Sequence, residues 1–218
     1  MIRNFCVLLH LLIVITLVNP SLKNPIINMD NPRLYIIAGC NGAGKTTASY
    51  TVLPEILDCT EYVNADEIAR GLSPFKPEEV AIEAGKIMLQ RIDHLLAKKV
   101  TFAIETTLAT RSYKKLIERA HAAGYTIILL FFWLPSPEMA EERVASRVSS
   151  GGHNILKNVI YRRYWLGIEN LFRIFAPIVD SWSLYDNSSM MSPIVENGIT
   201  IDKVKLSKIK LQCQNRIR

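Results

Sequence analysis

The chain of 218 residues has few cysteines and few histidines, four of each. The cysteines include no pair at the CxxC spacing and no cluster with histidine, which excludes a structural zinc site and a disulfide framework; they are Cys6, Cys40, Cys59 and Cys213. Repeats and low-complexity tracts are also absent, which excludes repeat arrays and largely disordered chains. A hydrophobic content of 49% is enough for one sizeable globular domain, and unpaired cysteines suit a reducing compartment.

Neither sign of charge dominates strongly. The net charge is +6, from 26 basic and 20 acidic residues. This balance suits an anionic substrate and equally suits nucleic acid, so it does not decide between them. Six of the 26 basic residues lie after residue 200, and we expect residues 191–218 to form a basic C-terminal tail that contributes little to a site.

Residues 39–46, GCNGAGKT, fit the phosphate-binding loop pattern GxxxxGK[ST] at every fixed position. An apolar run at 34–38 precedes the loop, and residues 45–53 can form a helix that ends near Pro54. A strand, a glycine loop and a helix in this order bind polyphosphate through backbone N–H groups and the helix N-terminus. The alternative is a glycine-rich turn with a solvated lysine.

On the phosphate-loop interpretation, Lys45 reaches the β- and γ-phosphates of ATP and the Thr46 hydroxyl holds Mg²⁺. The residues that we predict to contact the nucleotide are Gly39, Cys40, Asn41, Gly42, Ala43, Gly44, Lys45, Thr46 and Thr47.

Short apolar strands alternate with helical stretches along the chain. This alternation predicts an α/β fold: a five-stranded, parallel, doubly wound sheet with helices on both faces and the site at the carboxyl ends of the strands. A helix is predicted between the second and third strands, where Val80, Ala84, Met88, Ile92, Leu95 and Leu96 recur at helical spacing. The predicted strands are 34–38, about 61–64, 100–105, 126–133 and 183–185.

Acidic residues follow two of these strands. Asp66 follows the second strand and can accept a proton from a substrate hydroxyl, or it merely caps the short helix after it. Glu105 and Thr106 end the third strand and are candidates for binding substrate. Glu105 can also support Mg²⁺ through water. The alternative is a helix cap beside a surface ion pair. The fourth strand ends in Leu134-Pro135, so a protein carboxylate for Mg²⁺ has to come from Asp66 or Glu105.

Arginines gather between the fourth and fifth predicted strands, around Gly151-Gly152-His153. This pattern predicts an arginine-rich lid that folds cations over a transferring phosphoryl group. The alternative is a solvated basic face on two helices. The candidate catalytic arginines are Arg147, Arg162 and Arg163.

Residues 1–28 contain the longest apolar run, from Phe5 to Val18. Its 14 residues fall short of the roughly 20 that span a bilayer as a helix. Three explanations stay open: an incorrectly assigned start with Met29 as the first residue, a short membrane anchor, and a secretory signal. We favour the first, because an exported ATP-using enzyme would find little ATP, and we expect membrane association only if this segment is present in the cell.

The ordered motifs resemble the zeta toxin family of P-loop kinases over about residues 33–188. The motifs are GCNGAGKT (39–46), NADEIA (64–69), ETTL (105–108), LPSPE (134–138), RVASRVSSGGH (143–153), IYRRY (160–164) and LYDNS (184–188). One departure is Leu156, near which family members usually have a proline.

The resemblance implies a fold related to nucleotide kinases and chloramphenicol phosphotransferase. Characterised zeta toxins transfer the γ-phosphate of ATP to the 3′-hydroxyl of a UDP-N-acetylamino sugar and are held inactive by a small antitoxin protein. By the same resemblance, Lys45 and Thr46 bind ATP and Mg²⁺, Asp66 is the general base, Glu105 contacts substrate, and the lid arginines clamp phosphate. It does not identify which of Arg147, Arg162 and Arg163 are the two key arginines.

We therefore expect a cytoplasmic ATP- and Mg²⁺-dependent phosphotransferase, with a kinase domain at 29–190, that acts on a small anionic or sugar-nucleotide substrate such as UDP-N-acetylglucosamine. One alternative is a metabolite or nucleotide kinase without a toxic role. Another is an ATP-dependent switch that binds nucleic acid. We consider nucleic acid the least favoured partner, because the nearby aromatic residues form a helical stripe typical of a core: Tyr161, Trp165, Ile168 and Phe172.

Overall fold

The computed structural model describes residues 31–149 and 154–214. Its strands are β1 (Arg33–Gly39), β2 (Tyr62–Val63), β3 (Phe102–Thr106), β4 (Thr126–Trp133), β5 (Ser181–Asp186), β6 (Ser192–Glu196) and β7 (Ile199–Thr200). Its helices are α2 (Lys45–Glu55), α3 (Ala65–Leu72), η1 (Pro77–Val80), α4 (Ala81–Lys98), α5 (Tyr113–Ala122), α6 (Pro137–Ser149), α7 (Lys157–Asn170), η2 (Leu171–Phe175) and α8 (Lys203–Gln214).

The strands form one sheet in the order β2-β3-β1-β4-β5-β6-β7. The first five strands in this order are parallel, whereas β6 and β7 are antiparallel additions. The predicted α/β class is confirmed, but the predicted number of five strands is wrong, because the sheet continues through β6 and β7. The alternation of polar and apolar residues in β6 and β7 is too short for these strands to be predicted from the sequence.

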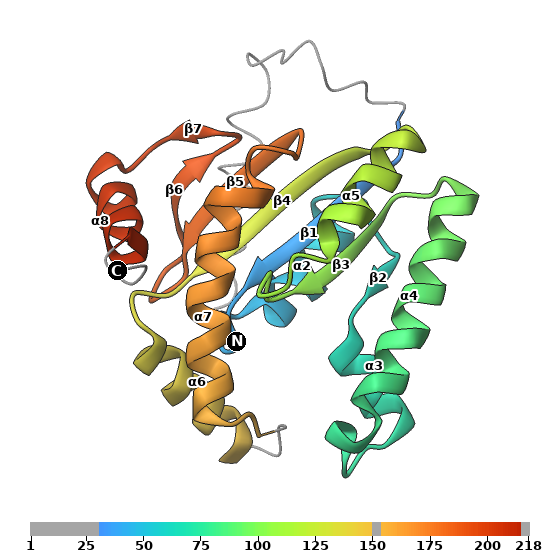
Figure 1. Cartoon of the computed structure of the whole chain (residues 1–218), viewed down its shortest axis with the longest axis horizontal. Coiled ribbons are helices and arrows are strands. Elements are labelled where there is room, and N and C mark those ends of the chain that lie inside the picture. Colours follow the sequence, from blue (N-terminus) through green and yellow to red (C-terminus); the bar gives the residue numbers. More distant parts are fainter. Residues whose placement is uncertain (1–30, 150–153, 215–218) are drawn as a thin grey trace.

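Helices cover both faces of the sheet. In Figure 1, α5 and α7 lie in front of the strands and α2 lies behind them. The central strand β1 is therefore buried on both sides, and each residue from Leu34 to Ala38 is at most 1% exposed. This double covering explains why β1 is a continuous apolar run instead of an alternating one.

The helix predicted between the second and third strands is α4, and it buries one stripe of apolar residues: Ala84, Met88, Ile92, Leu95 and Leu96. The helix after the phosphate loop ends at Glu55, with Pro54 in its last turn, close to the predicted end. In α6, the Ser136 hydroxyl accepts a hydrogen bond from the Met139 N–H at 3.2 Å. This is the N-terminal cap that the Ser-Pro-Glu sequence indicates.

Residues 192–214, which we expected to be part of a basic tail, are folded against the sheet. Ile194 and Val195 of β6 are fully buried, and α8 buries Leu206 and Ile209. The helix lies beside β6 at the edge of the sheet (Figure 1). Apolar residues at these positions, more than the lysines between them, decide where the segment lies.

None of the helices within 31–149 and 154–214 is both long and apolar enough to cross a membrane. The apolar run from Phe5 to Val18 lies outside the described residues.

We predict that Ile194→Ala lowers the free energy of unfolding by about 2–5 kcal/mol, because it leaves a cavity at a fully buried position of β6. Urea unfolding followed by circular dichroism measures the change. The matched control is Ile201→Ala, since Ile201 is 54% exposed and its truncation should change the free energy by no more than about 0.5 kcal/mol. Equal effects of the two substitutions would mean that β6 is not part of the cooperative core.

Candidate functional site

The end of β1 and the loop after it approach their neighbours so closely that Gly39 and Gly42 leave no room for a side chain. A Cβ on Gly39 would lie 2.3 Å from the Phe132 carbonyl oxygen, and one on Gly42 would lie 2.7 Å from that of Ala140. Both residues also have positive φ angles, 139° and 79°, which side chains disfavour. The loop is therefore held against β4 and α6 by contacts that any substitution would break.

Lys45 and Thr46 open α2 directly after this loop. The Lys45 side chain is buried, and its Nζ donates a hydrogen bond to the Cys40 carbonyl oxygen at 3.0 Å and lies 3.6 Å from Glu105 Oε1. The Thr46 hydroxyl donates to the Glu105 carboxylate, 3.0–3.1 Å from its two oxygens. The structure thus brings Glu105, from the end of β3, to the two residues predicted to hold ATP and Mg²⁺.

Tyr62 and Asn64 complete this cluster from the end of β2. The Tyr62 hydroxyl donates a hydrogen bond to Glu105, and Asn64 Nδ2 donates to the Tyr62 oxygen at 3.0 Å. Burial, and then the neighbouring charge of Glu105, raise the pKa of Tyr62 well above its usual range, so the phenol stays protonated and acts as a donor. No motif marks Tyr62 in the sequence, although it lies on the strand that leads to Asp66.

Asp66 lies in the first turn of α3, at the carboxyl-end edge of the sheet, and is exposed. The helix is capped by Asn64, whose Oδ1 accepts a hydrogen bond from the Asp66 N–H at 2.9 Å. The alternative interpretation of Asp66 as the helix cap is therefore wrong. Its charge also lies near Tyr113, whose pKa is raised by burial first and by Asp66 in addition.

The Thr106 hydroxyl forms a hydrogen bond within the loop that follows β3. Its Oγ1 accepts a hydrogen bond from the Leu108 N–H at 3.0 Å, and the residue is only 8% exposed. The neighbouring Thr107 carbonyl packs against Gly167 of α7, where a Cβ would lie 2.4 Å away. In the structure, Thr106 shapes the loop beside Glu105.

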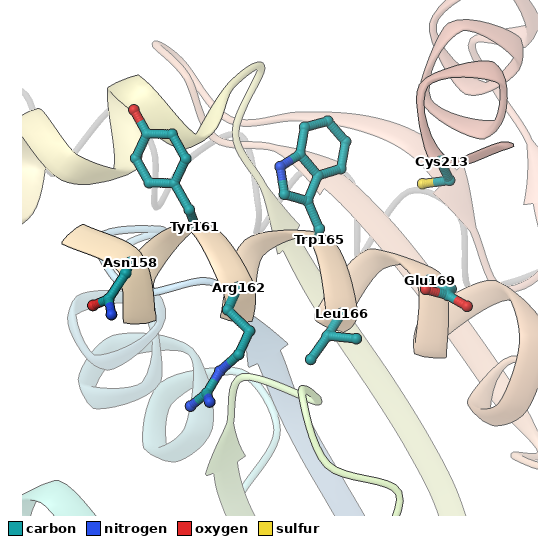
Figure 2. Close-up of a pocket in the computed structure, with 7 residues that line it drawn as sticks. All are labelled: Asn158, Tyr161, Arg162, Trp165, Leu166, Glu169 and Cys213. Carbon is teal, nitrogen blue, oxygen red and sulfur yellow. The ribbon is translucent and has the colours of Figure 1, made fainter. Parts of the chain in front are cut away.

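The three candidate arginines lie in different places. Arg163 Nη1 donates to Asn41 Oδ1 of the phosphate loop at 3.2 Å. Arg162, one residue earlier on α7, is exposed and points away from Tyr161 and Trp165 (Figure 2). Arg147 is exposed in the last turn of α6, and residues 150–153 of the predicted lid lie outside the described residues.

Helix α7 is fixed to the rest of the domain along its length. The Tyr164 hydroxyl donates to the Leu134 carbonyl at 2.7 Å, and Asn170 Nδ2 donates to the Leu108 carbonyl at the same distance. Together with the Arg163–Asn41 contact, these bonds tie the helix to the loops after β1, β3 and β4. Arg163 is therefore held in place by the contacts of α7 with the rest of the domain.

A surface cavity of about 520 Å³ runs along α7 (Figure 2). Its lining is Asn158, Tyr161, Arg162, Trp165, Leu166, Glu169 and Cys213. The phosphate loop contributes no residue to it, so this cavity is not the nucleotide site.

The chemistry of the donors fits magnesium better than a transition metal. Within the described parts of the chain, no three histidine, cysteine, aspartate or glutamate side chains group closely enough to hold a metal ion. Mg²⁺ is usually held by one or two protein oxygens together with phosphates and water, and Thr46 and Glu105 offer such oxygens. Burial raises the pKa of the Cys40 thiol to about 11, so this thiol is protonated and only its backbone serves the loop.

Comparison with known proteins identifies relatives in sequence and in structure. The sequence profile of the zeta toxin family matches residues 21–171. An uncharacterized protein of Haemophilus influenzae is 28% identical over 138 residues, which cover 62% of this chain and 94% of that protein.

Two solved structures share the fold. The AvrRxo1-ORF1:-ORF2 complex with ATP superposes with a TM-score of 0.68 at 16% identity, over 82% of this chain and 63% of that chain. The PezAT chromosomal toxin-antitoxin system of Streptococcus pneumoniae superposes with a TM-score of 0.61 at 17% identity, over 97% of this chain and 95% of that chain. This chain therefore spans less than two thirds of the AvrRxo1 chain but nearly all of the PezAT chain.

We predict that Gly167→Ala destabilises the fold by about 1–3 kcal/mol, because the new methyl group would overlap the Thr107 carbonyl and push α7 from the loop after β3. Thermal and urea unfolding measure the effect. Gly85 is the matched control, since it is also helical but has no atom within 4 Å of the position that a Cβ would take; Gly85→Ala should instead raise stability by up to about 1 kcal/mol. A neutral Gly167→Ala would contradict close packing of α7 on this loop.

Proposed function

The chain belongs to the zeta toxin family, and we propose that it is an ATP-dependent phosphotransferase that moves the γ-phosphate of ATP to a hydroxyl group of a small substrate. One observation carries this proposal: Lys45, Thr46 and Glu105 meet at the end of a glycine loop. The fold, which is that of P-loop kinases, places this cluster at the carboxyl ends of the parallel strands, where such sheets bind their ligands.

The residues fit ATP with Mg²⁺ in charge and in type. The loop supplies backbone N–H groups and the buried ammonium of Lys45 for polyphosphate, and the Thr46 hydroxyl is a suitable oxygen for the metal ion. When bound, ATP supplies the phosphoryl group and Mg²⁺ neutralises part of its charge. We assign Glu105 to the support of Mg²⁺, because its carboxylate already accepts the hydrogen bond of Thr46.

Asp66 is the general base in this proposal. It is exposed, it lies on the same sheet edge as the loop, and its helix is capped by Asn64 instead of by its own carboxylate. A carboxylate that is not used as a cap is available to accept the proton of a substrate hydroxyl. Asn64 also holds Tyr62, so one amide links the base helix to the residues around Glu105.

Arg163 is the arginine that we assign to charge stabilisation. Its guanidinium contacts the phosphate loop through Asn41 and is held there by an anchored helix. Fixed positive charge beside the transferring group stabilises the transition state without reorganisation during the reaction. We assign Arg147 of α6 and Arg162 of α7 to contacts with the phosphates of bound ATP.

For the acceptor we propose a sugar nucleotide, with UDP-N-acetylglucosamine as the first compound to test, and for the partner a small antitoxin protein. The choice of acceptor rests on the resemblance to characterised zeta toxins. The choice of partner is supported by the similar PezAT structure, which comes from a toxin-antitoxin system. Cytoplasmic action follows from the need for ATP.

We predict that the protein phosphorylates UDP-N-acetylglucosamine with ATP and Mg²⁺, and that Asp66→Asn lowers this rate by about 10²–10⁴-fold, because general base catalysis is lost, while ATP binding is retained. Mass spectrometry of the sugar nucleotide and isothermal titration with ATP give the two readings.

The control is Glu67→Gln, the next residue on the same helix, whose exposed pair with Arg70 contributes little and whose loss should leave the rate unchanged. Growth arrest on expression that Asp66→Asn relieves would support a toxic role. A protein that binds ATP but leaves this acceptor unmodified contradicts the choice of acceptor, and a protein that binds no ATP contradicts the proposed function altogether.

We predict that Glu105→Gln raises the Mg²⁺ concentration needed for half-maximal ATP binding by about 10–100-fold, because the neutral amide supports the metal ion less well. ATP binding titrated at several Mg²⁺ concentrations measures the shift without turnover. Glu61→Gln is the control, since Glu61 pairs with Arg91 at the surface. An unchanged Mg²⁺ dependence together with a raised KM for the acceptor would make Glu105 a substrate contact instead.

A further inference from the structure

We propose that Asn187, which follows β5, is a positioning residue that aims the phosphate loop at the polyphosphate. Its Nδ2 donates a hydrogen bond of 2.7 Å to the Ala43 carbonyl oxygen, across 144 positions of sequence. The inference rests on the proposed function, because it assigns a role in binding the phosphates of the nucleotide.

This hydrogen bond fixes the direction of the Gly44 N–H, because of the geometry of the peptide bond. The Ala43 carbonyl and the Gly44 N–H belong to one planar trans peptide, so they point in opposite directions. When Asn187 holds the carbonyl, the Gly44 N–H is turned away from Asn187. A P-loop needs this N–H to be available to the phosphates, and without a partner for the carbonyl the peptide can rotate.

The absence of a side chain at Gly44 leaves room for the amide group of Asn187. The φ of Gly44 is 83°, and a Cβ at this position would lie 2.6 Å from Asn187 Nδ2. A side chain at 44 would therefore collide with the amide that holds residue 43. The last glycine of the loop motif serves the approach of Asn187 as well as the left-handed backbone.

Asn187 is itself held on each side. Its backbone N–H donates to the Trp133 carbonyl at the end of β4 at 2.9 Å. The preceding Asp186 carboxylate accepts hydrogen bonds from Lys205 Nζ of α8 and from the Ser188 N–H. The following Ser188 carbonyl accepts one from Arg143 of α6 at 2.7 Å.

The Asp186–Lys205 contact connects the C-terminal helix α8 to the residue that precedes Asn187. Burial would raise the pKa of Asp186, but the hydrogen bonds from Lys205 and Ser188 hold it below its usual range. The carboxylate is therefore charged at neutral pH and keeps its bond to Lys205. Lys205 of α8 thus supports the site by fixing the turn that carries Asn187.

Binding of inorganic tripolyphosphate and of ATP, each with Mg²⁺, tests the role of Asn187. We expect Asn187→Ala to weaken both ligands by a similar factor, about tenfold or more, because both need the Gly44 N–H. Asn187→Leu, which keeps the volume but not the donor, should do the same and serves if the alanine variant does not fold. Gln90→Ala, an exposed amide on α4, is the control and should bind both ligands as the unchanged protein does.

The two ligands separate the possible results. Equal weakening of ATP and tripolyphosphate, with a melting temperature of the ligand-free protein close to that of the unchanged chain, supports the positioning role. Weakening of ATP alone would mean that Asn187 contacts the adenosine part, and unchanged binding of both would mean that the hydrogen bond has no functional effect; either result overturns the inference. If the unchanged protein binds neither ligand, the proposed function fails with it.

Discussion

The close approach of the glycine loop to its neighbours is the constraint on which the rest of the site depends. The loop touches the backbone of β4 through Gly39 and that of α6 through Gly42. Contacts at such distances leave no room for a side chain, so the two elements fix the path of the loop before a ligand binds. A cradle that is already formed loses little conformational entropy on binding and stabilises developing charge without rearrangement. The position of Lys45 and Thr46 follows from it, because α2 begins where the loop ends.

A buried ion pair lies at the centre of this arrangement. The side chains of Lys45 and Glu105 are 7% and 8% exposed, and charges at such depth are costly unless hydrogen bonds compensate for lost water. Here they do: Thr46 and Tyr62 donate to Glu105, and Lys45 donates to the Cys40 carbonyl. Such a pair contributes little net stability, whereas removing one partner costs about 3–5 kcal/mol. The net stability of the fold therefore does not by itself explain this cluster, which fits the proposed binding of ATP with Mg²⁺.

Helix α7 joins two parts of the site that the sheet alone would leave apart. It contacts the phosphate loop through Arg163 and the loop after β3 through Gly167 and Asn170. Directly after it the chain forms a short π-helix, Leu171–Phe175. Turns of this kind are rare and occur often at functional sites. Helix α7 thus holds Arg163 in place relative to the end of β3, which carries Glu105.

The sequence by itself determined the phosphate loop, the α/β class and the edge of the sheet that carries Asp66 and Glu105. These depend on local patterns, and the carboxyl ends of parallel strands always meet at one edge. Only the tertiary structure decided that Glu105 faces Thr46, that Arg163 instead of Arg162 reaches Asn41, and that Asn187 meets Ala43. It also decided that residues 192–200 add two strands to the sheet. The hydrogen bonds of Glu105, Arg163 and Asn187 join residues that lie 59–144 positions apart in the sequence. They depend on the strand order and on the rotation of each helix about its axis. A pattern of apolar residues selects which face of an element is buried, but it does not specify which polar groups meet across that face.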